Sequence, residues 1–219
     1  MKTLKINTTE FVRGFKIKNI NEEDSIVDQI MYITFELYKQ VRKRVWKING
    51  WEYYSETRAY FIGRTLKRIL KDDLKIKIEQ IKDLSPIIHE ATIDKDKKIS
   101  CKIELGSHEH FIEEAEAINY EYLENLQINL GFCTRWCTFS NKPWLQKPKK
   151  VHLRLWVGIK TTNPIDQSPV TSENMFETTI HEFIHVLDNI EKFFGKQISL
   201  ESTKPILEKV LNEFFIFEK

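Results

Sequence analysis

The sequence predicts an α+β protein, with helices towards both ends of the chain and short strands between them. Two observations predict this class. Apolar residues recur at three- and four-residue steps in several long stretches, and two central segments alternate with the period of two that is typical of strands. The chain has 219 residues, of which 41% are hydrophobic and 30% charged. It is therefore long enough to bury a hydrophobic core.

The N-terminal part is expected to combine strands with two helices. Residues 1–22 alternate loosely, as a strand or an ordered arm does. Asp24 and Ser25 cap a predicted helix that continues to the break at Asn49 and Gly50. A second helix is expected over residues 53–71.

Strands are predicted next. Residues 74–78 alternate, and residues 87–93 and 99–105 are expected to form a β-hairpin across a polar turn. A helix is predicted over 109–125, where His108 and His110 are interpreted as polar residues of its N-terminal cap, with metal binding as the alternative. Three strand-like segments follow, at 127–132, 136–140 and 151–159.

These elements suggest a boundary near residue 106. Residues 1–105 would form a helical and hairpin region of unknown role, and residues 106–219 a second domain. The second domain would end in two helices, one at about 170–194 and one from about 201–204 to 217.

The first of these two helices contains a His-Glu-x-x-His motif. His181 and His185 are four residues apart, so a helix places both imidazoles on one face, where they can bind the same metal ion. Glu182 is turned away from that pair and can reach a water molecule without being a ligand. The alternative is a pair of structural histidines, and the helical setting favours the metal site.

Charge is unevenly distributed along the chain. The formal net charge is +2, but residues 39–71 contain ten lysines and arginines against two glutamates. The simpler interpretation is a solvated face, or one that pairs with acidic residues elsewhere in the same chain. The alternative is a surface that binds nucleic acid. The candidates for nucleic-acid contact are Arg42, Lys43, Arg44, Arg64, Lys67 and Arg68.

Cysteine content and hydropathy predict a cytoplasmic protein that does not span a membrane. The three cysteines cannot form a complete disulfide framework, and the chain shows neither a signal-like leader nor a long apolar run. Cys133 and Cys137 have the spacing of half a zinc site, but two reduced cysteines in a strand are the favoured interpretation.

Residues 109–219 resemble the zincin metallopeptidases in the order helix, small mixed sheet, His-Glu-x-x-His helix and final helix. The resemblance implies a zincin-like domain in which the sheet packs on the motif helix and the following helix supplies a ligand. It also implies Zn²⁺ held by three protein ligands, with one position left for water. Leu130-Gly131-Phe-Cys and Val151-His-Leu-Arg-Leu are similar to SprT-like proteases, but no histidine follows His185.

A carboxylate would then be the third ligand, as in the gluzincins. Glu208-Lys-Val-Leu-Asn212 is similar to the tail motif of ImmA/IrrE-like metallopeptidases, which favours Glu208. Glu213-Phe-Phe resembles the lethal-factor and MtfA branches and is the alternative. Asp188 and Asn212 are expected as hydrogen-bonding partners of the ligands, with an exposed polar role as the alternative for Asp188.

The expected function is that of a zinc-dependent hydrolase, a metalloprotease that cleaves a protein or peptide substrate with Glu182 as general base. The candidates for the residue that stabilises the oxyanion are Tyr120, Tyr122, His152 and Arg154. The alternative is a DNA-associated or regulatory protein of the same fold with weak or no peptidase activity, which would bind nucleic acid through residues 39–71.

Overall fold

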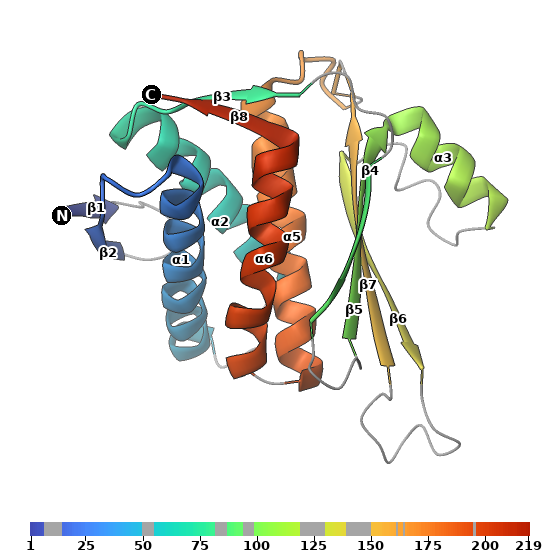
Figure 1. Ribbon diagram of the computed structural model, residues 1–219, viewed down its shortest axis with the longest axis horizontal. Coiled ribbons are helices and arrows are strands. Elements are labelled where there is room, and N and C mark those ends of the chain that lie inside the picture. Colours follow the sequence, from blue (N-terminus) through green and yellow to red (C-terminus); the bar gives the residue numbers. More distant parts are fainter. Residues whose placement is uncertain are drawn as a thin grey trace.

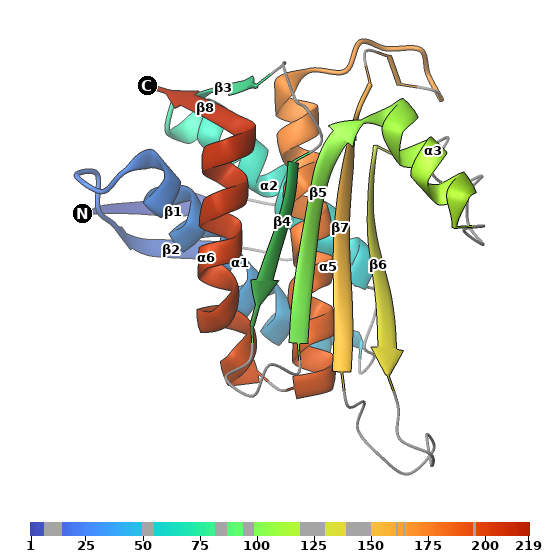
Figure 2. The ribbon, with the colours of Figure 1, turned by 45° about the vertical axis from the view of Figure 1, so that its right-hand side comes forward.

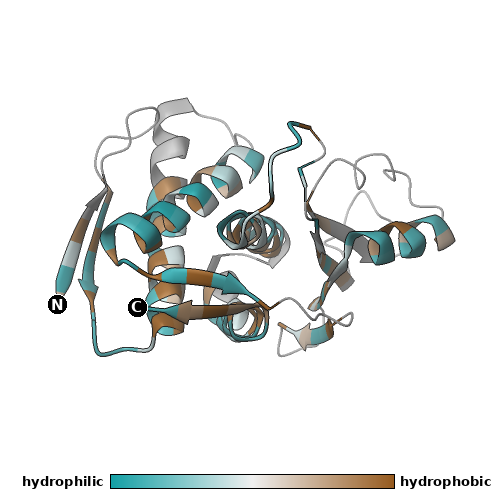
Figure 3. Cartoon of the chain, turned by 90° about the horizontal axis from the view of Figure 1, so that it is seen from above, coloured by the Kyte–Doolittle hydropathy of each residue, from teal (hydrophilic) through white to brown (hydrophobic). Residues whose placement is uncertain are grey.

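The computed structural model shows an α+β fold in layers (Figure 1). The residues that it describes are 1–6, 15–49, 55–81, 87–93, 99–118, 130–138, 150–160, 162–163, 165–194 and 196–219. Helices lie between a small two-stranded sheet near the N-terminus and a four-stranded sheet, and Figure 3 shows this layering from above.

The N-terminal sheet confirms the strand interpretation of residues 1–22. β1 (Lys2–Ile6) pairs antiparallel with β2 (Phe15–Ile20). Phe15 and Ile17 alternate with exposed residues and are fully buried, so one face of this sheet packs on the core.

Two helices follow the sheet. α1 (Ile26–Asn49) begins as predicted, because the Ser25 hydroxyl accepts a hydrogen bond from the Asp28 backbone N–H at 3.1 Å and caps the first turn. α2 (Ser55–Arg68) continues into a π-helical turn, η1 (Ile69–Asp73). The second helix therefore ends about two residues later than predicted, and residues 53 and 54 of the predicted range lie outside the described residues.

The larger sheet has the strand order β4-β5-β7-β6 (Figure 2). The hairpin of β4 (Ile87–Thr92) and β5 (Ile99–Ser107) is confirmed, and β5 pairs in parallel with β7 (Lys150–Ile159). β6 (Gly131–Thr138) completes the sheet as an antiparallel partner of β7. β6 is continuous across the gap predicted between 132 and 136, and residues 127–129 lie outside the described part of the chain.

One short helix covers the outer face of this sheet. α3 (His108–Ala117) begins with a cap in which Ser107 accepts from the His110 N–H, so the cap residue precedes the two histidines predicted for that role. Phe111 of α3 stacks on Trp156 of β7 at 5.8 Å between ring centroids. The helix ends eight residues earlier than predicted, and residues 119–129 lie outside the described residues.

The inner face of the sheet packs on α5 (Ser172–Phe194), the helix that carries the motif. α5 also contacts α2 and α6 (Lys196–Phe214), so it lies between two layers. Phe176, Ile180 and Phe183 are fully buried on it, and each such side chain stabilises the fold by about 1.5–3 kcal/mol.

The C-terminal segment corrects the predicted final helix. α6 ends at Phe214, and the next residues form β8 (Phe215–Glu218), which pairs antiparallel with β3 (Lys77–Gln80). Phe215 is buried and its ring contacts that of Phe176 at 5.5 Å, so packing on α5 favours the strand. β3 itself begins three residues later than the predicted strand 74–78.

Residues from both sides of the predicted domain boundary share one core. The boundary near residue 106 falls inside β5, and the main hydrophobic cluster extends from Leu4 to Phe215. None of the described helices is long and apolar enough to cross a membrane.

Candidate metal centre

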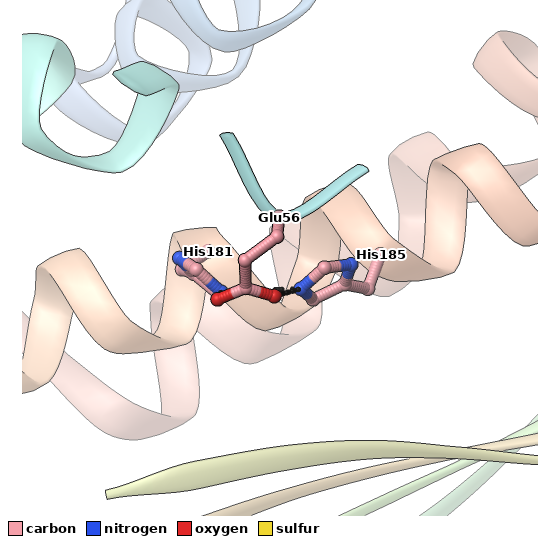
Figure 4. Close-up of side chains that lie close together, drawn as sticks. All are labelled: Glu56, His181 and His185. Carbon is pink, nitrogen blue, oxygen red and sulfur yellow. Dashed lines mark hydrogen bonds and ion pairs between the residues drawn. The ribbon is translucent and has the colours of Figure 1, made fainter. Parts of the chain in front are cut away.

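The histidine pair of α5 faces away from the buried stripe of that helix. His181 and His185 are partly buried, and their Nε2 atoms are 3.1 Å apart. The four-residue spacing and the helical backbone therefore bring both imidazoles to one point, as the motif predicts (Figure 4).

The carboxylate beside the histidines belongs to Glu56, in the first turn of α2. Its two oxygens lie 3.1 Å from His181 Nε2 and 3.0 Å from His185 Nε2. The side chain is 72% exposed, and it extends from α2 to both histidines (Figure 4).

This donor set fits a zinc ion. One nitrogen or oxygen from each of Glu56, His181 and His185 lies within 4.8 Å of the others. Ligands at about 2.0–2.1 Å from a tetrahedral ion are roughly 3.3 Å from each other, which is close to the separations found here. Two imidazoles and one carboxylate are also a set that catalytic zinc sites use.

The second ring nitrogen of His185 is held by the first residue of α2. Ser55 Oγ lies 2.7 Å from His185 Nδ1. If Nδ1 carries the proton and donates it to the hydroxyl oxygen, Nε2 keeps a free lone pair on the side of Glu56. The same turn of α2 thus contacts His185 at both nitrogens.

The environment keeps both imidazoles neutral near pH 7. Burial lowers the pKa of His181 to about 4, helped by the neighbouring His185 and opposed by Glu56. Burial also lowers the pKa of His185, and the Glu56 and Asp188 carboxylates oppose that shift. Neutral imidazole is the form that binds a metal.

Glu182 is buried beside the pair, with 7% of its surface exposed. Burial raises the pKa of its carboxyl to about 8, and the Glu56 carboxylate adds to the rise. Gly131 at the start of β6 packs directly on this side chain, because a Cβ atom there would lie 2.9 Å from Glu182 Cγ. The strand can approach Glu182 so closely only because residue 131 is glycine.

His181, Glu182 and His185 line a cleft of about 650 Å³. Glu56 and Tyr60 of α2 also line it, as do Leu130 and the first residues of β6. Its size is within the range of small-molecule and peptide sites.

Among the described residues, Asp188 bonds to Tyr38 and Arg58 and not to an imidazole, so neither predicted role, partner of a ligand or exposed polar residue, is the one found. Its Oδ1 accepts from the Tyr38 hydroxyl at 2.8 Å, and its Oδ2 pairs with Arg58 at 3.1 Å. Arg58 is two residues after Glu56, so this contact connects α1, α2 and α5 next to the histidines.

The two glutamates predicted as third ligand lie outside the cluster. Glu208 is exposed on α6, and Asn212, predicted to support it, is exposed as well. Glu213 pairs with His89 of β4. In this structure it is Glu56, and neither Glu208 nor Glu213, that lies beside the two histidines.

The residues considered for the oxyanion are not at the site either. His152 contacts Ser100 at 2.7 Å, and Arg154 pairs with Glu104 and Glu114 on the outer face of the sheet. Tyr120 and Tyr122 lie outside the described residues. Tyr60, which lines the cleft and was not predicted, is about half exposed there.

The nucleic-acid candidates are divided between two helices. Arg42, Lys43 and Arg44 belong to α1, but their side chains lie outside the described part of the structure. On α2, Arg64 and Arg68 are exposed, whereas Lys67 pairs with Glu177 of α5.

The contribution of α2 to the site, through Ser55 and Glu56, was not predicted because no local sequence pattern indicates it. Ser55 and His185 are 130 residues apart in the chain, and Glu56 lies in a segment that is otherwise strongly basic. The only signal is that Glu56 is the one acidic residue of the predicted helix 53–71, whose other charged residues are all basic.

Comparison of the chain with protein-family models, with curated proteins and with solved structures gives no match.

Proposed function

We propose that the protein is a zinc-dependent metallopeptidase of the zincin type, whose third ligand precedes the motif in the chain. The observation that carries this proposal is the convergence of His181, His185 and Glu56 beside the buried Glu182 in one cleft. The gluzincin assignment is not retained, because it depended on a glutamate of the last helix.

Zinc, when bound, would supply a Lewis acid that lowers the pKa of water and polarises a carbonyl group. His181, His185 and Glu56 would hold it. Glu182, buried next to the two histidines, would accept a proton from the attacking water and deliver it to the leaving amine.

Tyr60 is the residue to which we assign stabilisation of the carbonyl oxygen. It is one helical turn after Glu56 on α2, and both residues line the cleft. Its hydroxyl can donate a hydrogen bond, as an oxyanion requires.

The cleft itself supports a peptide as substrate. Its volume of about 650 Å³ is within the range of ligand sites, and three consecutive residues of β6, Gly131 to Cys133, line it.

The test combines metal analysis with hydrolysis of a fluorescence-quenched peptide library. Purified protein is expected to contain about one zinc ion per chain and to lose hydrolysis when a chelator removes it. Glu182→Gln should retain zinc but lose at least about 100-fold in turnover, because the amide cannot accept the proton. Hydrolysis that survives in this variant, or in metal-free protein, would contradict the proposal.

A second candidate function is nucleic-acid binding, favoured by the exposed cations Arg64, Arg68 and Lys71 on α2 and η1. Binding of a DNA duplex that weakens steeply with salt, and weakens further in Arg64→Ala/Arg68→Ala, would support it. Equal binding by that double variant would argue against this face.

A further inference from the structure

β6 contacts a different layer of the fold through each of two successive residues. Gly131 faces α5, where a Cβ atom would lie 2.8 Å from Thr178 Cγ2 and 2.9 Å from Glu182 Cγ. Phe132 points to the opposite face of the sheet, because side chains alternate along a strand. There it packs against a small cluster formed by Phe111, Ala115 and Trp156. The strand that touches Glu182 is therefore backed by an aromatic side chain on its other face.

This outer cluster, formed by Phe111, Ala115, Trp156 and Phe132, gives the backing a fixed position. Trp156 is 1% exposed and lies opposite Phe132 in the pairing of β6 with β7. Phe111 of α3 stacks on its indole with 10° between the ring planes, and the Arg154 guanidinium carbon lies 4.1 Å from the ring centroid. Figure 2 shows α3 at the end of the sheet where β6 begins, so the cluster lies behind the first residues of that strand.

Buried polar contacts hold the indole and α3 together. The Trp156 indole N–H donates to Glu104, and Arg154 pairs with both Glu104 of β5 and Glu114 of α3. Burial acts to raise the pKa of the Glu104 carboxyl, but hydrogen bonds from Arg154 and Lys102 bring that pKa below its usual value. Glu104 therefore stays ionised near pH 7, and the ring against which Phe132 packs is anchored to two strands and a helix.

The separation of β6 from α5 matters most at Glu182. The position of a Gly131 Cβ atom would lie 3.3 Å from Glu182 Oε1, so the strand covers one side of this carboxyl group. Glycine supplies no side chain that could set the distance between the two backbones at this point. The neighbouring Phe132 does so from the opposite face, because it fills the space between β6 and the outer cluster.

We infer that Phe132 is a positioning residue for Glu182, which it holds through Gly131 at the place where that carboxyl group accepts the proton of the attacking water. The inference rests on the proposed function, because it presupposes that Glu182 is the general base. The three metal-binding residues come from α2 and α5. Phe132 should therefore influence Glu182 and leave the affinity for zinc unchanged.

A double-mutant cycle in ligand binding tests this relation without turnover. Zinc-loaded protein is titrated calorimetrically with acetohydroxamate, which loses a proton when it binds zinc, and Glu182 would accept that proton. Glu182→Gln and Phe132→Ala should each lower the affinity by about 10- to 100-fold, as loss of a supporting contact at a metal site does. The double variant should bind no more weakly than Glu182→Gln alone, because Phe132 acts through Glu182. Zinc affinity should equal that of the wild type in all three variants.

A milder variant and a matched control complete the experiment. Phe132→Leu keeps a smaller apolar side chain, so it preserves the test if the alanine variant does not fold, and it should show a smaller loss with the same dependence on Glu182. Phe217→Ala is the control, since Phe217 is also a partly buried phenylalanine of a strand and packs against the main core. It should lower thermal stability and leave the affinity for acetohydroxamate unchanged.

The outcomes separate this inference from the proposed function. Losses that multiply in the double variant, or an unchanged affinity in Phe132→Ala, would overturn the role of Phe132 alone. An equal loss in Phe217→Ala would do the same, because the effect would then follow from stability. Protein that binds neither zinc nor acetohydroxamate, or an unchanged affinity in Glu182→Gln, would overturn the proposed function and this inference with it.

Discussion

Glu56 completes the candidate centre although its carboxylate is mostly exposed to solvent. Its two oxygens face the two imidazoles that α5 holds in place. The two histidines are neutral and partly buried, so the exposed carboxylate provides the negative charge that a divalent cation requires.

Replacing the Glu56 carboxylate shows whether Glu56 or Glu208 is the third zinc ligand. Glu56→Ala is expected to weaken zinc binding by more than about 100-fold, because loss of a ligand should exceed the 10–100-fold effect of losing a supporting contact. Competition with a chromogenic chelator measures the affinity.

Glu208→Ala is the matched control for this experiment, since it removes an exposed glutamate of α6. Its zinc affinity should equal that of the wild type. Loss of zinc in Glu208→Ala together with retention in Glu56→Ala would restore the assignment based on the tail motif.

Cys101 and Cys133 are expected to differ in reactivity because they differ in burial. Cys101 is fully buried in β5, and burial raises the pKa of its thiol to about 12. Because the thiolate is the reactive form, Cys101 should stay unmodified by iodoacetamide at pH 8 in the native protein and react only in urea.

Cys133 is the internal comparison, because it is partly exposed in the cleft and should be alkylated in the folded state. Peptide mass spectrometry distinguishes the two sites. Equal labelling of Cys101 in native and unfolded protein would show that β5 is not buried as described.

At the scale of elements, the contact between α2 and α5 decides whether the site exists. A Cβ atom at Gly63 would lie 2.8 Å from the Glu177 carbonyl oxygen, so glycine lets the two helices approach closely. One turn earlier, Arg58 and Asp188 pair across the same interface, and Tyr38 joins them from α1. Glu56 is thus positioned by packing and by a partly buried ion pair.

Asp188→Asn tests this positioning. The amide keeps the shape but loses the charge that faces Arg58, so unfolding free energy should fall by about 1–3 kcal/mol. Zinc affinity should fall roughly 10- to 100-fold, because Glu56 and Ser55 are held less firmly.

Chemical denaturation and zinc titration check the two effects in the same preparation. Arg68→Ala, an exposed change on α2, should alter neither quantity appreciably. An Asp188→Asn variant with lower stability but unchanged zinc affinity would mean that the ion pair supports the fold without placing Glu56.

The same scale shows which features the sequence could predict. α1 and α5 were predictable because their apolar periodicity is long, and the β4–β5 hairpin because its strands are close in the chain. β8 was not, because its aromatic run also fits a helical stripe, and only the pairing with the distant β3 decides between them. The role of Glu56 could not be predicted for a similar reason, because it depends on how α2 packs on α5.

For the whole molecule, a bound metal would join two layers of the fold. Glu56 lies on α2 and the histidines on α5, so the ion would bind the native arrangement and not the unfolded chain. Zinc at 100 times its dissociation constant should therefore add about 2.7 kcal/mol to the free energy of unfolding.

Differential scanning calorimetry with zinc and with a chelator measures this stabilisation as a rise in Tm. The rise should be smaller in Glu56→Ala, and Glu208→Ala should behave as the wild type. An equal rise in Glu56→Ala would place the stabilising ion elsewhere.

The distance along the chain between the parts of the centre also has a consequence for synthesis. Ser55 and His185 are separated by 130 residues, so at about 5–20 residues per second the second arrives roughly 6–26 s after the first. Throughout that interval α2 has no α5 to pack against, and a growing chain holds a lone carboxylate where the finished protein has three converging donors. Any proteolytic activity of this centre would therefore begin only after residue 185 has been made, so the residues before it are synthesised while the centre is still incomplete.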